Sequence, residues 1–199
     1  MNANHPVSVT LAEFTAVFVP FGILVVFALL WPEFTETLDL NRTKATIWAA
    51  SILLIPALVL YPFRTMSIGI ANLSHLYWTF AGFIFVLHAY WAVFVIFNGI
   101  GDTFKQMGPI VASVNFFLTI WWIIDVVWLW TTSSESASFA RAQLAARVFV
   151  FLVFAVTLVA LRGGSVRILG FVFIAAVLAA LLVRLWARAR VINGQVQTA

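Results

Sequence analysis

Long apolar runs, separated by short polar stretches, set the pattern of this chain. A helix that crosses a bilayer needs about 20 mostly apolar residues, because each residue rises about 1.5 Å through about 30 Å of hydrocarbon. The runs lack the alternation of a membrane-spanning strand, which favours helices over a barrel. The pattern therefore predicts one all-α domain over 1–199, with transmembrane helices at 10–31, 45–63, 77–98, 108–131, 144–162 and 166–186.

The composition supports an integral membrane protein. Of the 199 residues, 64% are hydrophobic and 9% are charged, whereas about 25% of the residues in a soluble domain are charged. The absence of cysteine excludes disulfides, thiolate metal sites and cysteine nucleophiles. For a membrane protein, the net charge of +4 indicates contact with anionic lipid headgroups and argues against a nucleic-acid partner.

The distribution of lysine and arginine among the loops predicts the orientation, because these residues favour the cytoplasmic side. Six spans place both chain ends on one side. That side carries Arg64, Arg141, Arg147, Arg184, Arg188 and Arg190, and the other side carries Arg42, Lys44, Lys105, Arg162 and Arg167. The basic tail at 184–190 tips this near tie towards cytoplasmic termini, and we expect a multi-pass protein of a bacterial inner membrane.

Polar side chains within the spans gather in the third and fourth segments, which the loop at 99–107 makes antiparallel neighbours. At about 100° per residue, the fourth segment brings four residues into an arc of about 120°. They are Asn115, Thr119, Trp122 and Asp125. His88 in the third segment lies near the level of Asn115, and we expect a hydrogen bond between them. The last two segments contain almost no polar side chain except Thr157, which predicts that they face lipid or another subunit.

Asp125 and His88 each have a functional and a structural interpretation. An aspartate within a span costs roughly 2.5–3.5 kcal/mol on an insertion scale, so it is a functional hypothesis by default. In the structural alternative, Asp125 snorkels towards the membrane surface or pairs with Arg64 or Arg141, which lie towards the same side. For His88, the structural alternative is that its bond to Asn115 holds the third and fourth helices together.

Histidine positions allow two cofactor hypotheses. His75 and His88 resemble the paired histidines on one helix of the di-haem b cytochromes, but their separation of 13 residues turns them about 220° apart. A bis-histidine haem would therefore need two protomers that meet at His88. A chlorophyll-like pigment needs only one axial histidine, which His88 could supply. No other metal site is predicted, and without paired carboxylates or a GxSxG motif an enzyme is the least favoured class.

Tryptophans inside the spans complete the candidate site. Trp91 and Trp122 lie near the level of His88 and Asn115, where they could line a site for a quinone, a pigment or a lipid, or simply fill the core. The leading hypothesis is a non-catalytic membrane subunit or binding protein. It would hold such a ligand or a partner membrane protein, as a homo-oligomer or with other membrane subunits. The alternative is a proton or small-solute channel or transporter along the third and fourth helices.

Overall fold

The computed structural model describes residues 8–34, 37–132, 136–160 and 163–196. Within these ranges all regular structure is helical, and six helices are long and apolar enough to cross a membrane. The predicted class, an all-α polytopic membrane protein with six spans, is confirmed. The helices are α1 (Leu11–Leu30), α2 (Leu38–Leu60), α3 (Ile68–Tyr90), α4 (Ile100–Met107), α5 (Pro109–Thr131), α6 (Ala137–Val159) and α7 (Gly164–Val196).

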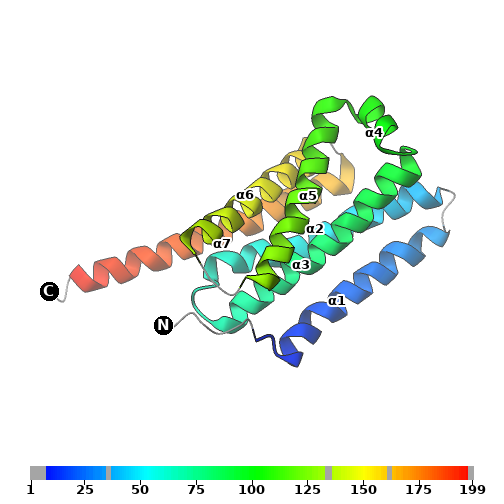
Figure 1. Ribbon diagram of the computed structural model, residues 1–199. Helices are drawn as coiled ribbons and strands as arrows, with labels where there is room; N and C mark the ends of the chain where they lie inside the picture. Colours follow the sequence, from blue (N-terminus) through cyan, green and yellow to red (C-terminus); the bar gives the residue numbers. More distant parts are fainter. Residues whose placement is uncertain (1–7, 35–36, 133–135, 161–162, 197–199) are drawn as a thin grey trace.

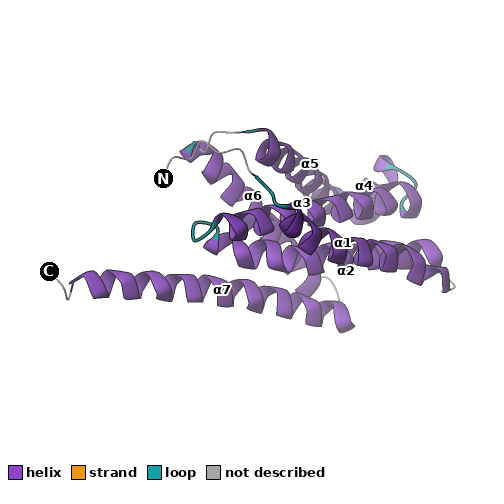
Figure 2. Cartoon of the chain, turned by 90° about the horizontal axis from the view of Figure 1, so that it is seen from below, coloured by secondary structure: helices purple, strands orange, loops and turns teal. Residues whose placement is uncertain are grey.

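Helices α2 and α3 form the centre of the bundle, with α1 on one flank and α6 and α7 on the other (Figure 1). Both chain termini lie at one end of the bundle, and α4 lies at the opposite end. Helix α7 extends past the other helices towards the C-terminus, as Figure 2 also shows. Half of the most apolar window of α2 is buried inside the bundle, against 11% of that of α1, so α1 is the most peripheral span.

Three spans begin earlier than the apolar runs predicted. Helix α2 starts at Leu38 instead of 45, α3 at Ile68 instead of 77, and α6 at Ala137 instead of 144. The physical reason is that a helix can continue through polar residues at the membrane surface until a capping group ends it. Ser67 caps α3 by accepting a hydrogen bond from the Ile70 amide at 3.2 Å, and Ser136 caps α6 in the same way.

The connection between the third and fourth spans was wrongly predicted as a loop, since it contains helix α4. Residues with positive φ bound this helix: Asn98 at 58°, Gly99 at 118° and Gly108 at 79°. Glycine adopts these angles without a Cβ clash, so the chain can turn sharply at both ends of α4. On its polar face Lys105 Nζ donates a 2.8 Å hydrogen bond to Asp102, which raises the pKa of Lys105.

Many polar side chains within the spans serve the fold by bonding to a nearby carbonyl. The Ser51 hydroxyl donates to the carbonyl of Ile47 within α2, whereas the Ser74 hydroxyl donates at 2.9 Å to the Ala57 carbonyl and so joins α3 to α2. Such bonds satisfy a hydroxyl that would otherwise be unpaired in an apolar interior. Buried polar groups that lack such a bond to a nearby carbonyl are therefore the candidates for a functional site.

Candidate functional site

An ion pair between Asp125 of α5 and Arg147 of α6 lies in the interior of the bundle. Both side chains are only 2% exposed, and Arg147 Nη1 lies 3.5 Å from Asp125 Oδ2. The same carboxylate oxygen accepts a 2.8 Å hydrogen bond from Trp78 Nε1 on α3. Arg147 Nη1 also donates at 3.1 Å to the carbonyl of Gln143, one turn earlier in α6. One carboxylate thus connects α3, α5 and α6.

Aromatic rings pack against the Arg147 guanidinium. Its Cζ atom lies 4.3 Å from the ring centroid of Tyr61, which follows α2 directly, and 4.7 Å from that of Trp78. On the same Tyr61 ring lies a second guanidinium, that of Arg64, at 3.9 Å. Aromatic faces attract cations most strongly where water is excluded. Two guanidinium groups therefore lie on the Tyr61 ring, and one of them is paired with the Asp125 carboxylate.

Donor groups around Arg147 outnumber the acceptors. Nε and Nη2 of Arg147, the Gln143 side-chain amide nitrogen and the Tyr61 hydroxyl are all buried and have no hydrogen-bond partner among the described residues. Nδ1 of His75, one turn before Trp78 on α3, is in the same state. Each buried group without a partner costs roughly 1–3 kcal/mol. The centre of this site is therefore rich in N–H and O–H groups that can bind an acceptor.

Arg147 is the site residue that the sequence analysis missed. It was counted with the loop cations, and the structural alternative for Asp125 named Arg64 or Arg141 as a partner, whereas the ion pair is made with Arg147. The last two segments were expected to face lipid or another subunit, whereas the fifth also buries Arg147 inside the bundle, with Gln143 buried just before its predicted start. A signal existed in the sequence, because Arg147 falls on the helical stripe that α6 buries. The stripe also contains Ala146, Val150, Phe154 and Leu158.

His88 joins α3 to α2. We predicted a hydrogen bond from His88 to Asn115, but the Nδ1 atom contacts α2 instead. Nδ1 lies 2.9 Å from the carbonyl oxygen of Thr43 and 3.4 Å from the hydroxyl of Thr46, both on α2. The reason is packing: α2 is the principal neighbour of α3, and helix α5 lies on another side. Trp91 lies three residues after His88 and begins the π-helical segment Trp91–Ile96. The centroid of the Trp91 ring lies 6.0 Å from the Arg42 guanidinium.

The predicted arc on α5 divides into two parts. Asn115 and Thr119 are half-buried and bond to their own helix: the Asn115 amide donates to the Val111 carbonyl, and the Thr119 hydroxyl to the Asn115 carbonyl. Trp122 and Asp125 are buried in the core. The Trp122 ring packs against that of Trp78, with the ring centroids 4.7 Å apart and the ring planes tilted by 33°. The structure therefore brings Trp122 and Asp125 together with Trp78, and leaves His88, Trp91, Asn115 and Thr119 outside that centre.

The haem hypothesis depends on two histidines, which α3 holds apart, whereas the pigment hypothesis depends on His88 alone. Thirteen residues separate His75 from His88, about 20 Å along a helix, so the two cannot ligate one iron within a protomer. Among the described residues, no group of three or more His, Asp or Glu side chains is placed to hold a metal ion. A haem between two protomers, or a chlorophyll-like pigment on His88, stays a prediction.

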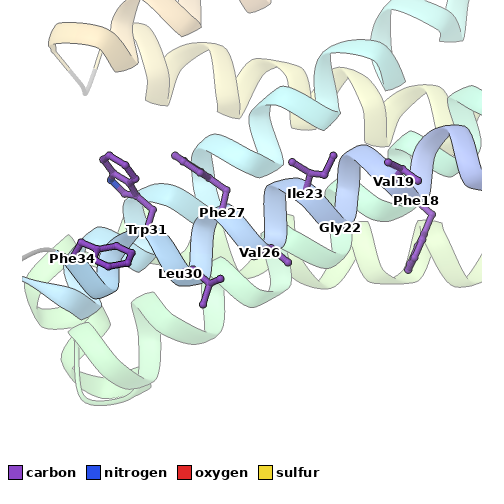
Figure 3. A pocket seen from close by; sticks show the side chains of 9 residues that line it. All are labelled: Phe18, Val19, Gly22, Ile23, Val26, Phe27, Leu30, Trp31 and Phe34. Carbon is purple, nitrogen blue, oxygen red and sulfur yellow. The ribbon is translucent and has the colours of Figure 1, made fainter.

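An open apolar groove follows the outer face of α1 and the short helical turn after it (Figure 3). Its volume is about 660 Å³. Gly22 lies within it, and a Cβ added there would meet no atom within 4 Å. The lining side chains are Phe18, Val19, Ile23, Val26, Phe27, Leu30, Trp31 and Phe34. All nine lining residues are apolar, so the groove suits an apolar helix or a lipophilic molecule.

Two features thus stand out from the packing of the bundle: the donor-rich centre at Arg147 and the groove along α1. They lie in different parts of the structure, since the centre is built by α3, α5, α6 and the end of α2. Comparisons of this chain with protein families, with curated proteins and with solved structures found no match.

Proposed function

We propose that this protein is a non-catalytic integral membrane subunit, which assembles with a second copy of itself along the outer face of α1. The observation that carries the proposal is the apolar groove along α1, which contains Gly22. It crosses the span that is least buried by its own chain. In this proposal the second copy covers the face of α1 that the protomer leaves open.

The spacing of the groove residues supports a helix as the occupant. Phe18, Gly22, Val26, Leu30 and Phe34 follow one another at steps of four. Steps of four form the inclined ridges that interlock when two helices cross at about −50°. A small residue at the crossing lets the two backbones approach, as in right-handed transmembrane dimers. The row covers about 24 Å of helix, which matches a second transmembrane helix better than a compact ligand.

A two-fold dimer fits this groove because the same surface of α1 would be buried on both copies. In such a dimer each patch faces its own copy, with Gly22 near the axis and Ile23 and Val26 beside it. The lining residues provide no charged or hydrogen-bonding group, apart from the Trp31 indole, that would select a chemically different partner. Self-association therefore needs no feature beyond those that α1 already has.

The proposed location is a bacterial inner membrane with cytoplasmic termini. With Arg147 inside the bundle, the loops and helix ends carry Arg64, Arg141, Arg184, Arg188 and Arg190 on the terminal side, and five basic residues remain on the other side. The count alone no longer favours one orientation. Support comes from the exposed Arg188 and Arg190 on the projecting end of α7, where anionic cytoplasmic lipids attract basic side chains.

Cross-linking in native membranes tests the dimer, and a chain without cysteine suits it. Val26→Cys is expected to form a covalent dimer with a short bis-maleimide. Val172→Cys on α7 is the matched control, because the two valines are 55% and 53% exposed. Adding Gly22→Leu to Val26→Cys should reduce the cross-linked fraction at least tenfold, since the leucine fills the space at the crossing.

Equal cross-linking at Val26 and Val172, or none at either position, would contradict the dimer. Mild-detergent purification followed by an absorption spectrum and lipid mass spectrometry tests the alternative occupant. A stoichiometric quinone, pigment or lipid that Gly22→Leu displaces from a monomer would make the groove a ligand site instead.

A second candidate function is proton or small-solute transport, and the buried Asp125–Arg147 pair favours it. Ionisable side chains within spans commonly mark proton or solute pathways. The measurement is proton and solute flux into proteoliposomes for wild type, Asp125→Asn and His88→Ala. Transport through the centre predicts at least a tenfold lower flux for Asp125→Asn, with a smaller change for His88→Ala, which lies outside it. Unchanged flux in both variants, with lower thermal stability alone, would make the two residues structural.

A further inference from the structure

We infer that the buried centre at Arg147 is a binding site for an oxoanion, either a carboxylate or a phosphate group. The inference does not depend on the dimer along α1, because no residue of the α1 groove contributes to this centre. It rests on the unpaired edge of one guanidinium, on the donors beside it and on the charge balance around Tyr61.

The edge of the Arg147 guanidinium that carries Nε and Nη2 forms a fork of two N–H groups, which can bind an anion. Nη1 is engaged by Asp125 and by the Gln143 carbonyl, whereas Nε and Nη2 have no partner among the described residues. In arginine, Nε–H and one N–H of Nη2 point the same way, and this pair binds two oxygens of a carboxylate or phosphate side by side. The Tyr61 and Trp78 rings stack on the guanidinium, so an acceptor would approach in its plane, along this edge.

Further donors belong to two residues that contact Arg147, namely Tyr61 and Gln143. The Tyr61 ring that stacks on Arg147 carries a buried hydroxyl, and Gln143 one turn away carries a buried side-chain N–H, and neither has a partner within the described ranges. An oxoanion has enough lone pairs to accept from several such donors. Asp125 does not meet this demand in the structure, because its contact with Arg147 is made to Nη1, at 3.5 Å, and leaves Nε and Nη2 without a partner among the described residues.

The charge balance also favours an anion. Arg147 and Arg64 both lie on the Tyr61 ring, at 4.3 and 3.9 Å, while Asp125 is the carboxylate paired with Arg147. Arg64 is half-buried at the end of α2, near the level of the lipid headgroups. Side chains on α6 tilt towards its N-terminus, so Arg147 reaches towards the same membrane surface. An acidic headgroup or a soluble anion would enter from there.

Native mass spectrometry and thermal unfolding of the detergent-purified full chain test the inference. Wild type is expected to retain oleate at least tenfold more than oleyl alcohol, which has the same chain without the carboxylate. Sodium acetate and sodium phosphate, compared with chloride at equal ionic strength, distinguish the source. A rise in Tm with these salts indicates a soluble anion, and retention of oleate without that rise indicates a lipid.

Variants of the fork give a second test. Arg147→Lys keeps the charge but removes the paired N–H groups, so it should weaken oleate retention about tenfold. Gln143→Glu places a carboxylate beside Arg147 and should abolish oleate retention while it raises Tm, because the new carboxylate occupies the fork. Arg188→Lys is the control, since Arg188 is exposed on the projecting end of α7. Equal retention of oleate and oleyl alcohol without a Tm response to either salt, or Gln143→Glu binding oleate as wild type does, would overturn the site.

Discussion

Asp125→Ala is expected to lower the free energy of unfolding by about 3–5 kcal/mol, because Arg147 would remain buried without its carboxylate partner. The substitution also removes the acceptor of the Trp78 indole hydrogen bond. Unfolding in a mixed-micelle denaturant series, followed by tryptophan fluorescence, measures the loss. Trp78 is fully buried beside the ion pair, so its emission should report the opening of this part of the bundle.

A double variant separates the charge from the packing. Asp125→Leu with Arg147→Met removes both ions, and replacing a buried pair by apolar side chains is often neutral or stabilising. The double variant should therefore be more stable than Asp125→Ala. Asp102→Ala on α4 is the control, because its partner Lys105 is 78% exposed and an exposed pair contributes at most about 1 kcal/mol. A loss for Asp125→Ala no greater than that for Asp102→Ala would show that the buried pair does not hold α3, α5 and α6 together.

Gly170→Ala is expected to destabilise the hairpin of α6 and α7 by about 1–3 kcal/mol, the range for overpacking a tight interior. A Cβ at Gly170 would lie 2.9 Å from the Cβ of Leu158 and 2.8 Å from a methyl carbon of Val159. It would also lie 3.2 Å from the Leu158 carbonyl carbon, which belongs to the backbone of α6. A side-chain rotation cannot remove the two contacts with Leu158, because its Cβ and carbonyl carbon move only with the backbone, so the two helices must move apart.

The matched control is Gly22→Ala, because the new Cβ at that position meets no atom within 4 Å. Both glycines lie inside spans, so the difference between the two variants isolates the close approach of α7 to α6. Thermal unfolding of each variant as a detergent-solubilised monomer, in which the face of α1 is uncovered, should give a clearly lower Tm for Gly170→Ala than for Gly22→Ala. Equal values would contradict the close packing at Gly170.

Several properties of this protein follow from the sequence alone. The six apolar runs determine the number of spans, since burial in hydrocarbon depends on the local density of apolar residues and not on distant contacts. The same reasoning singled out Asp125, because a carboxylate inside a span is costly whatever its neighbours are. Span starts were less predictable: α3 and α6 begin at serine caps that lie before the apolar runs, because capping and not hydropathy sets where these helices begin.

The partners of the site residues were decided by the tertiary structure. Nothing local to Asp125 indicates that Arg147, 22 residues later, is its counter-ion. Nor does His88 carry a sign that its Nδ1 bonds to the backbone of α2 rather than to Asn115. The physical reason is that a helix fixes which side chains share one of its faces, whereas helix–helix packing decides which neighbour each face meets. Arg147 could be placed on the buried stripe of α6 from its spacing, but the rings and the carboxylate around it come together only when α3, α5 and α6 pack.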